Sequence, residues 1–270
     1  MKVASDKEID LSHSGLPLKF DCGTRKMIFA KSLVPIRPDI RLLVGYRSFF
    51  RSASASGPEE LYYMYRGVMR REDETLFRRM GLRFDITVIF PGQVGDEYIR
   101  TIGHEHPVSP FSSMGLTYPE AYEVLAGEAA YLMQKVTGAG MVEDVIVIRA
   151  RRGEKALIPP GYGHVTINMT DEMLVMSNLV ESSFASKYER FQERGPAYYA
   201  LVGKEDFQMN PHYEKLPPLR FLAAREFPEM GIVKNTPLYS SFLHQPERFH
   251  YLVNPDQLAY LWGKITSSKA

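Results

Sequence analysis

Three histidines lie in two short segments whose spacing suits metal binding. His104 and His106 are separated by one residue, and His164 follows a Pro-x-Gly turn about 60 positions later. Residues two apart on a strand point to the same face, so the first two imidazoles can bind one ion while Glu105 points away. The turn before His164 places it at the start of a second strand, on the same face as Asn168.

A carboxylate between these segments completes a candidate ligand set. Glu120 shares a strand face with Tyr122 and Val124, whereas Glu123 falls on the opposite face, where we expect it to be solvated. Three imidazoles and one carboxylate suit Fe(II), Mn(II), Ni(II), Co(II) or Zn(II). Four protein ligands on an octahedral ion leave two neighbouring positions for substrate oxygens, and a catalytic ion needs such positions. We therefore expect one divalent metal ion per chain, used in catalysis.

The segments that carry these residues have the pattern of short strands. Residues 83–90 alternate, with Phe84, Ile86 and Val88 on one face, and a Pro-Gly pair follows. Turn residues recur about every 8–12 positions without an intervening helical period, which predicts an all-β antiparallel sandwich or barrel. The other expected strands are 98–106, 121–126 and 130–136 (joined as a hairpin at Gly127), 144–150, 155–158, 165–168 and 173–179.

The regions on either side of this β segment have weaker patterns. Residues 51–60 are small and polar and predict a surface loop, residues 61–65 have high β propensity, and residues 187–194 favour a short helix. We predict three parts, listed in chain order. They are an N-terminal segment packing on the barrel (1–60), a metal-binding catalytic domain (61–195) and a C-terminal extension packed on the barrel or on a partner subunit (196–270).

Composition narrows the classes of partner and compartment. The 270 residues include 33 Lys and Arg against 32 Asp and Glu, so a net charge of +1 offers no electrostatic reason to expect nucleic acid or an anionic membrane as partner. The single cysteine, Cys22, excludes an internal disulfide and suits a reducing compartment. The start of the chain lacks the apolar stretch of a secretory signal, and no window approaches the roughly 20 apolar residues that span a bilayer. We expect a cytoplasmic protein.

The histidine spacings resemble the two motifs of the cupin superfamily, G(x)5HxH(x)3–4E(x)6G and G(x)5PxG(x)2H(x)3N. The second motif is matched at every position over residues 153–168. The first is matched in its His-x-His pair and its glutamate, but Tyr98 replaces the leading glycine and 13 residues, rather than three or four, precede Glu120. We interpret residues 107–119 as an inserted surface loop. The resemblance implies a cupin barrel, also called a jelly roll or double-stranded β-helix, with N-terminal and C-terminal extensions.

A closer resemblance covers roughly residues 60–180. The run IFPGxVGxE followed by TxGHxH at 101–106, the upstream Tyr62-x-x-Tyr65 and the downstream PPxxxHxTxN over 159–168 are similar to the cupin-type phosphoglucose isomerases found mainly in archaea. This resemblance implies interconversion of glucose 6-phosphate and fructose 6-phosphate. Carried over to matching positions, the metal ligands would be His104, His106, Glu120 and His164, and the substrate contacts would be Tyr62, Thr87, Thr101, Gly103 and Tyr122.

Two routes for moving hydrogen between C1 and C2 remain open. Either a base, Glu120 or a metal-bound hydroxide, removes the C2 proton and the sugar passes through a cis-enediol, or a hydride shifts without a base. One departure from the family concerns residues 180–188, where only Tyr188 corresponds to a Tyr- and His-containing segment. Two alternative functions are another cupin enzyme (a dioxygenase or a different sugar-phosphate isomerase or epimerase) and a non-catalytic sugar-binding cupin. By analogy with cupins we expect a homodimer.

Overall fold

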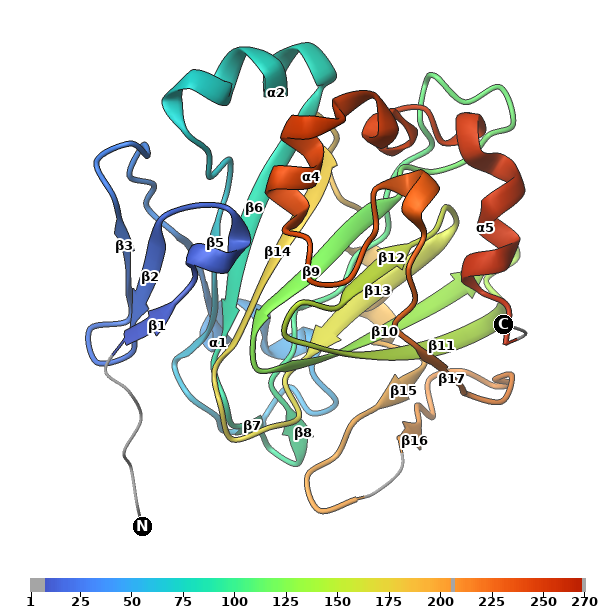
Figure 1. The fold of residues 1–270 in the computed structure, drawn as a ribbon. Coiled ribbons are helices and arrows are strands. Elements are labelled where there is room, and N and C mark those ends of the chain that lie inside the picture. The colour runs from blue at the N-terminus through green and yellow to red at the C-terminus, as the bar shows by residue number, and fades with distance from the viewer. Residues whose placement is uncertain (1–7, 205–206, 269–270) are drawn as a thin grey trace.

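Two β-sheets face each other and enclose the interior of the molecule (Figure 1). The structure, a computed structural model, describes residues 8–204 and 207–268. The six-stranded sheet has the order β12-β9-β14-β6-β5-β4 and consists of Lys155–Ile158, Glu120–Ala126, Leu174–Glu181, Leu82–Ile89, Glu60–Tyr65 and Asp39–Leu42. The four-stranded sheet has the order β13-β10-β11-β17 and consists of Tyr162–Ile167, Glu128–Val136, Val142–Arg151 and Arg220–Ala223.

This architecture confirms the predicted all-β cupin barrel. Neighbouring strands are antiparallel throughout the two sheets, except that β17 runs parallel to β11. The strands expected at 61–65, 83–90, 144–150, 155–158, 165–168 and 173–179 are all present within a few residues of those bounds. Alternation and turn residues located these strands because most of them are short and several end at a Gly or Pro turn.

The expected hairpin at Gly127 is wrong. The strands on either side of this glycine, β9 and β10, belong to different sheets. Gly127 has φ +76°, and a Cβ there would lie 2.6 Å from the Met173 carbonyl oxygen. The turn therefore carries the chain across the barrel from one sheet to the other. A glycine turn between two strands has the same local sequence signal whether the strands pair or face each other.

The expected strand over 98–106 is mostly wrong as well. Only the two residues of β8 (Glu97–Tyr98) are strand, paired with β7 (Gln93–Val94). Beyond them the backbone makes isolated bridges, Arg100 with Ile167 and His104 with His164. Gly103 lies in the left-handed region at φ +84°, which interrupts a regular pleat. Residues 99–104 run alongside the edge strand β13 and are joined to it by these bridges and by backbone hydrogen bonds, without forming a regular strand.

The remaining elements cover the barrel. The small sheets are formed by β1 (Glu8–Asp10), β2 (Leu18–Asp21) and β3 (Lys26–Phe29), and by β15 (Tyr198–Tyr199) with β16 (Gln208–Met209). The helices are α1 (Leu43–Tyr46), α2 (Glu74–Met80), α3 (Glu189–Arg194), α4 (Leu238–His244) and α5 (Ala259–Ile265), with 3-10 turns at Ser12–Ser14, Arg47–Phe49, Arg71–Asp73, Pro228–Met230, Pro246–Leu252 and Pro255–Leu258. Helix α3 confirms the helix expected near 187–194. None of the helices in the described ranges has the length and apolar character needed to cross a membrane.

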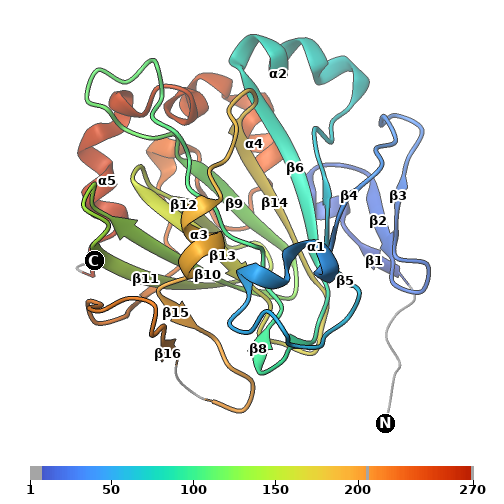
Figure 2. The same cartoon turned by 180° about the vertical axis from the view of Figure 1, so that it is seen from behind.

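The six-stranded sheet is largely buried on both faces, except at its edge strand β4. Its inner face joins the core between the two sheets, and its outer face is covered by α2 and α4 (Figure 1). Aromatic rings make this second core: Phe77 lies 4.6 Å from Phe242, and Phe84 lies 5.1 Å from Tyr239, between ring centroids. Helices α1 and α3 lie on the side of the barrel away from α4 (Figure 2). The inner face is therefore the one available to form a site.

Burial of the outer face corrects the expectation for Glu123. Its exposed fraction is 2%, so it is not solvated. One carboxylate oxygen lies 3.1 Å from Lys155 Nζ, and the other accepts a hydrogen bond from the Leu238 amide at 2.7 Å. Alternation assigned Glu123 to the outer face, but it could not show that a C-terminal helix covers that face.

Both regions outside 61–195 contribute a strand to the barrel. Strand β4 precedes residue 61 and extends the six-stranded sheet, and β17 follows residue 195 and extends the four-stranded sheet. Arg220 on β17 is held by two contacts to Asp144, at 2.9 and 2.6 Å. The division into 1–60, 61–195 and 196–270 stays a prediction, and its parts at 1–7, 205–206 and 269–270 lie outside the described residues.

Candidate metal and substrate site

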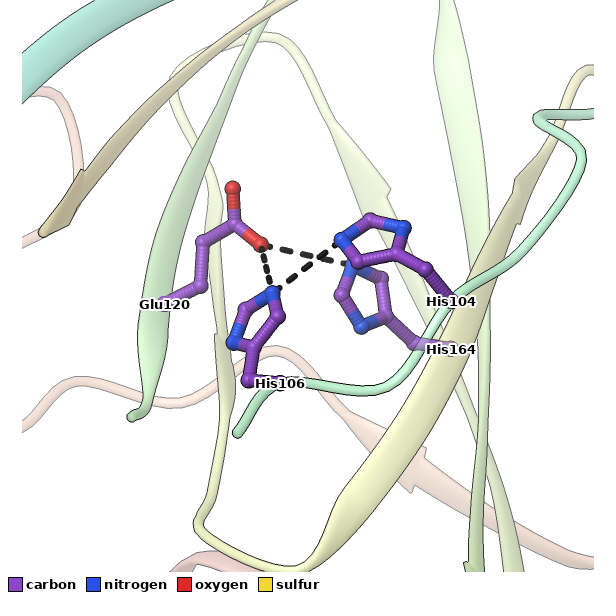
Figure 3. A group of neighbouring side chains, drawn as sticks. All are labelled: His104, His106, Glu120 and His164. Carbon is purple, nitrogen blue, oxygen red and sulfur yellow. Dashed lines mark hydrogen bonds and ion pairs between the residues drawn. The ribbon is translucent and has the colours of Figure 1, made fainter. Parts of the chain in front are cut away.

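The four predicted metal ligands meet inside the barrel (Figure 3). Their ligand atoms all lie within 4.8 Å of one another. His104 Nε2 lies 3.1 Å from His106 Nε2, and Glu120 Oε2 lies 3.4 Å from both His106 Nε2 and His164 Nε2. Glu120 begins β9 and His164 belongs to β13, so the two facing sheets and the irregular segment of His104 and His106 each supply part of the group.

Backbone hydrogen bonds hold the segment of His104 and His106 against β13. The His104 amide donates to the His164 carbonyl at 3.3 Å, and the His164 amide donates to the His104 carbonyl at 3.0 Å. Gly103 is required next to this bridge, because a Cβ at that position would lie 2.4 Å from the Phe191 ring. The glycine thus lets the chain pass close to α3 while presenting both histidines to the interior.

The donor atoms fit a cation. His106 Nδ1 donates to the Tyr118 carbonyl at 2.8 Å, which leaves a lone pair on Nε2 facing Glu120. Glu120 Oε2 is buried and has no hydrogen-bond partner among the described residues. Buried acceptors that face one another are costly without a positive charge between them. Two ligands at a right angle, each about 2.1 Å from one ion, lie about 3 Å apart, close to the separations found here.

The protonation states also suit metal binding. Burial, with the nearby His164 and His106, holds the pKa of His104 well below its usual value. Burial likewise lowers the pKa of His164. Burial acts to raise the pKa of Glu120, but its contacts with His106 and His164 outweigh burial and lower it. At neutral pH these two imidazoles are neutral and the carboxylate is ionised, which are the forms that bind metal ions.

The five predicted substrate contacts line the same cavity, which has a volume of about 330 Å³, within the range of small-molecule sites. The Tyr62 hydroxyl accepts from the Ile102 amide at 3.2 Å, and burial raises the pKa of Tyr62 to about 12. The Thr101 hydroxyl accepts from the Thr166 amide at 2.9 Å. Tyr62, Thr87, Thr101, Gly103 and Tyr122 all lie on this wall, with His104, His106 and Glu120. Their binding roles stay predictions.

Comparison with known proteins identifies the family. The profile described as Glucose-6-phosphate isomerase (GPI) matches residues 39–217, more than half of the chain. The chain belongs to the glucose-6-phosphate isomerase family. Curated relatives include the glucose-6-phosphate isomerase of Pyrococcus furiosus, 28% identical over 138 residues, and that of Thermococcus litoralis, 29% identical over 114 residues. These matches cover 50% and 42% of this chain, and 66% and 54% of the relatives' own lengths.

Two solved structures overlap part of the chain. An oxalate oxidase in complex with the substrate analogue glycolate overlaps 40% of this chain and 43% of its own, at 20% identity and a TM-score of 0.29. The oxalate decarboxylase of Bacillus subtilis overlaps 47% of this chain and 27% of its own, at 16% identity and a TM-score of 0.31. At such scores these overlaps carry no information about the reaction.

The cavity is also lined by charged residues that the sequence patterns did not indicate. Arg83 and Asp85 lie on the same face of β6 as Thr87, opposite the apolar face of that strand. The alternation within 83–90 could have revealed them, because the face away from Phe84 is the one that lines the cavity. Arg41 and Arg66 gave no such signal, since the pairing of β4 with β5 is not visible in the sequence.

The insertion over 107–119, as expected, forms a loop beside His104, His106, Glu120 and His164, which we call the ligand group. Val108 and Thr117 bridge its two ends, and Tyr118 returns the chain to the site by accepting the hydrogen bond from His106. Phe184 stacks on Tyr118 and lies 4.5 Å from the His106 ring. Tyr188, the one residue in 180–188 that matched the family pattern, lines the cavity at 5.8 Å from the His104 ring.

Proposed function

We propose that this chain catalyses the metal-dependent interconversion of glucose 6-phosphate and fructose 6-phosphate. Membership of the family and the names of the curated relatives support the reaction. The observation that carries the proposal is that Glu120, His104 and His106 share one cavity with hydroxyl-bearing side chains. A single cavity can therefore hold the reacting carbons of a sugar near the ligand group and bind its other oxygens along the wall.

We propose His104, His106, Glu120 and His164 as ligands of one divalent cation, with Fe(II), Mn(II), Ni(II), Co(II) and Zn(II) all compatible with this donor set. When bound, such a cation supplies Lewis-acid polarisation of the oxygens at C1 and C2. The chain contributes the orientation of its ligands. The Tyr118 carbonyl fixes His106 through Nδ1, the nitrogen that does not face Glu120. The Tyr122 hydroxyl lies 3.1 Å from His164 Nε2, the nitrogen that faces Glu120, and so adjoins the proposed ligand atom itself.

Glu120 is the proposed base for the proton at C2. It lines the cavity, and its second carboxylate oxygen points away from the three imidazoles (Figure 3). The contacts to His106 and His164 lower the pKa of Glu120, so the carboxylate is ionised at neutral pH. It would take the proton from C2 and return it to C1, so that the sugar passes through a cis-enediol.

The five wall residues are proposed to bind and orient the open-chain sugar. Thr87 and Thr101 offer hydroxyl groups, and Tyr62 offers a buried phenol next to the Ile102 amide. Tyr122 joins the wall to the ligand group through His164.

We also propose that the chain acts as a homodimer in the cytoplasm, on the strength of the cupin resemblance and the single free cysteine.

A coupled assay tests the reaction. Purified protein loaded with Mn(II) or Fe(II) is expected to form glucose 6-phosphate from fructose 6-phosphate, and to lose this turnover on treatment with a chelator. The double variant His104→Ala and His106→Ala is expected to lose both bound metal and turnover, whereas His212→Ala, an exposed histidine outside the cavity, retains both. Absence of turnover in metal-loaded protein would overturn the proposal and leave a different cupin reaction or a binding role.

A further inference from the structure

Arg41 lies at the edge of the six-stranded sheet with an unused donor turned into the protein. Its side chain is 14% exposed and lines the same cavity as the ligand group. Nη1 donates to Asp39 at 2.7 Å, but Nε is buried and has no acceptor among the described residues. A guanidinium has five N–H donors in a fixed fork, and a buried donor without an acceptor is unfavourable. Arg41 therefore brings to the cavity wall a guanidinium with a donor left over, and a guanidinium is suited to an anionic ligand.

The position of Arg41 separates it from the ligand group. Arg41 is on β4 and Glu120 is on β9, and the three strands β14, β6 and β5 lie between them in the sheet. Arg41 stands directly opposite Tyr62 in the β4–β5 pair, so both side chains point to the same face. The carboxylate at one side of the cavity and the guanidinium at the other give the cavity two chemically different ends.

Arginines are the cationic side chains of the cavity lining. Three of them line it, Arg41, Arg66 and Arg83. Two carboxylates compensate them: Asp39 contacts Arg41 and Arg66, and Asp85 contacts Arg83 at 2.8 Å and Arg66 at 3.9 Å. When Glu120, one of the proposed metal ligands, is left out, three positive charges meet two negative ones and one positive charge stays unmatched.

We propose that Arg41 binds the phosphoryl group of the substrate and thereby selects phosphorylated sugars over neutral ones. This inference rests on the proposed function. It adds a charged residue, which no sequence motif indicated, to the cavity wall formed by Tyr62, Thr87, Thr101 and Gly103. A guanidinium offers two parallel N–H groups to a phosphate, and such charge-assisted bonds are about twice as strong as neutral ones. Arg41 is a binding residue in this account, distant from the carbons that react.

The test measures phosphate binding apart from catalysis. Inorganic phosphate is titrated by calorimetry into the wild type, Arg41→Gln, Arg41→Lys and the control Arg149→Gln, an exposed arginine on β11 outside the cavity. We expect Arg41→Gln to weaken phosphate binding about 10- to 100-fold, the loss of a hydrogen bond to a charged group. Arg41→Lys keeps the charge without the fork and should restore part of the affinity, and Arg149→Gln should match the wild type.

Steady-state kinetics then separate this inference from the proposed reaction. The KM of Arg41→Gln for fructose 6-phosphate should rise about 10-fold or more while kcat changes little, because Arg41 contacts a group that does not react. Wild-type turnover with an unchanged KM in this variant would overturn the role of Arg41 and leave the reaction intact. Arg41-dependent phosphate binding without wild-type turnover would overturn the reaction and leave the phosphate subsite. A wild type that does not bind inorganic phosphate would also overturn the subsite.

Discussion

Glu123 and Lys155 form a buried ion pair with an N–O distance of 3.1 Å, on the face of β9 opposite to Glu120. The two side chains are directly opposite each other in the β9–β12 pair, and each is 1–2% exposed. Glu123 also accepts from the first amide of α4. This pair therefore joins the strand that carries a proposed metal ligand to the C-terminal segment that covers the sheet.

Removal of Lys155 should strongly destabilise the fold. In Lys155→Met the Glu123 carboxylate stays buried without its cation, and breaking such a pair typically costs about 3–5 kcal/mol. Urea unfolding checks this value. The matched control is Lys135→Met, which removes an exposed pair with Glu143 (N–O distance 3.2 Å) and should cost about 0–1 kcal/mol. Equal effects of the two substitutions would contradict the structural role of the buried pair.

The same variant should have a distinctive pH dependence. Burial raises the pKa of Glu123, and Lys155 opposes this shift, so the pKa rises further when the lysine is removed. A carboxyl group with a raised pKa in the folded state binds more protons folded than unfolded. The stability of Lys155→Met relative to wild type should therefore fall as the pH rises above 4.5, the ordinary pKa of this group. Unfolding curves at pH 5 and pH 8 measure the effect, and a loss that shrinks towards pH 8 would be inconsistent with it.

Thr87→Val tests the cavity wall. Thr87 lies on β6 between Met64 and Met176 in the paired strands, and valine has nearly the same shape without the hydroxyl. If the hydroxyl binds the sugar phosphate, the KM for fructose 6-phosphate should rise about 5- to 10-fold, the value of one hydrogen bond. Initial rates over a range of substrate concentration provide the measurement. An unchanged KM would remove Thr87 from the binding site.

Glu120→Gln tests the proposed base. The substitution keeps the size of the side chain and removes its charge, so metal should bind more weakly and kcat should fall about 100-fold or more even at saturating metal.

In D2O the wild type should incorporate solvent deuterium at C1 or C2, because a carboxylate that takes the C2 proton exchanges it with solvent. Product free of deuterium in NMR or mass spectra would favour the hydride shift instead.

Asp256→Ala tests how the inserted loop is held. Asp256 accepts hydrogen bonds from the Ser112 and Ser113 hydroxyls and from the Ser113 and Met114 amides. Loss of these acceptors should raise amide hydrogen exchange at residues 112–114 while exchange in the barrel strands stays the same. Asp171→Ala, an exposed aspartate elsewhere, is the control. Unaltered exchange at the loop would show that other contacts hold it.

Local sequence patterns predicted most of the barrel and all the members of the ligand group. Strands such as β6 and β11 were located because alternation and Gly or Pro turns act within a few residues. Features that depend on contacts between residues far apart in the chain were not predicted. Gly127 joins two sheets instead of a hairpin, and Glu123 is buried because α4 covers it, so neither outcome is encoded within a short window. Arg41 was missed for the same reason, since its place in the cavity depends on the pairing of β4 with β5.

The central claim is that the four ligands hold one divalent cation on which turnover depends. The most direct measurement is a titration of metal-free protein with Mn(II), in which bound metal and isomerase turnover are followed on the same samples. The account predicts that turnover rises in proportion to bound metal and reaches its maximum at one ion per chain, and that the double variant His104→Ala and His106→Ala shows neither. Full turnover in metal-free protein, or stoichiometric metal in the double variant, would contradict it.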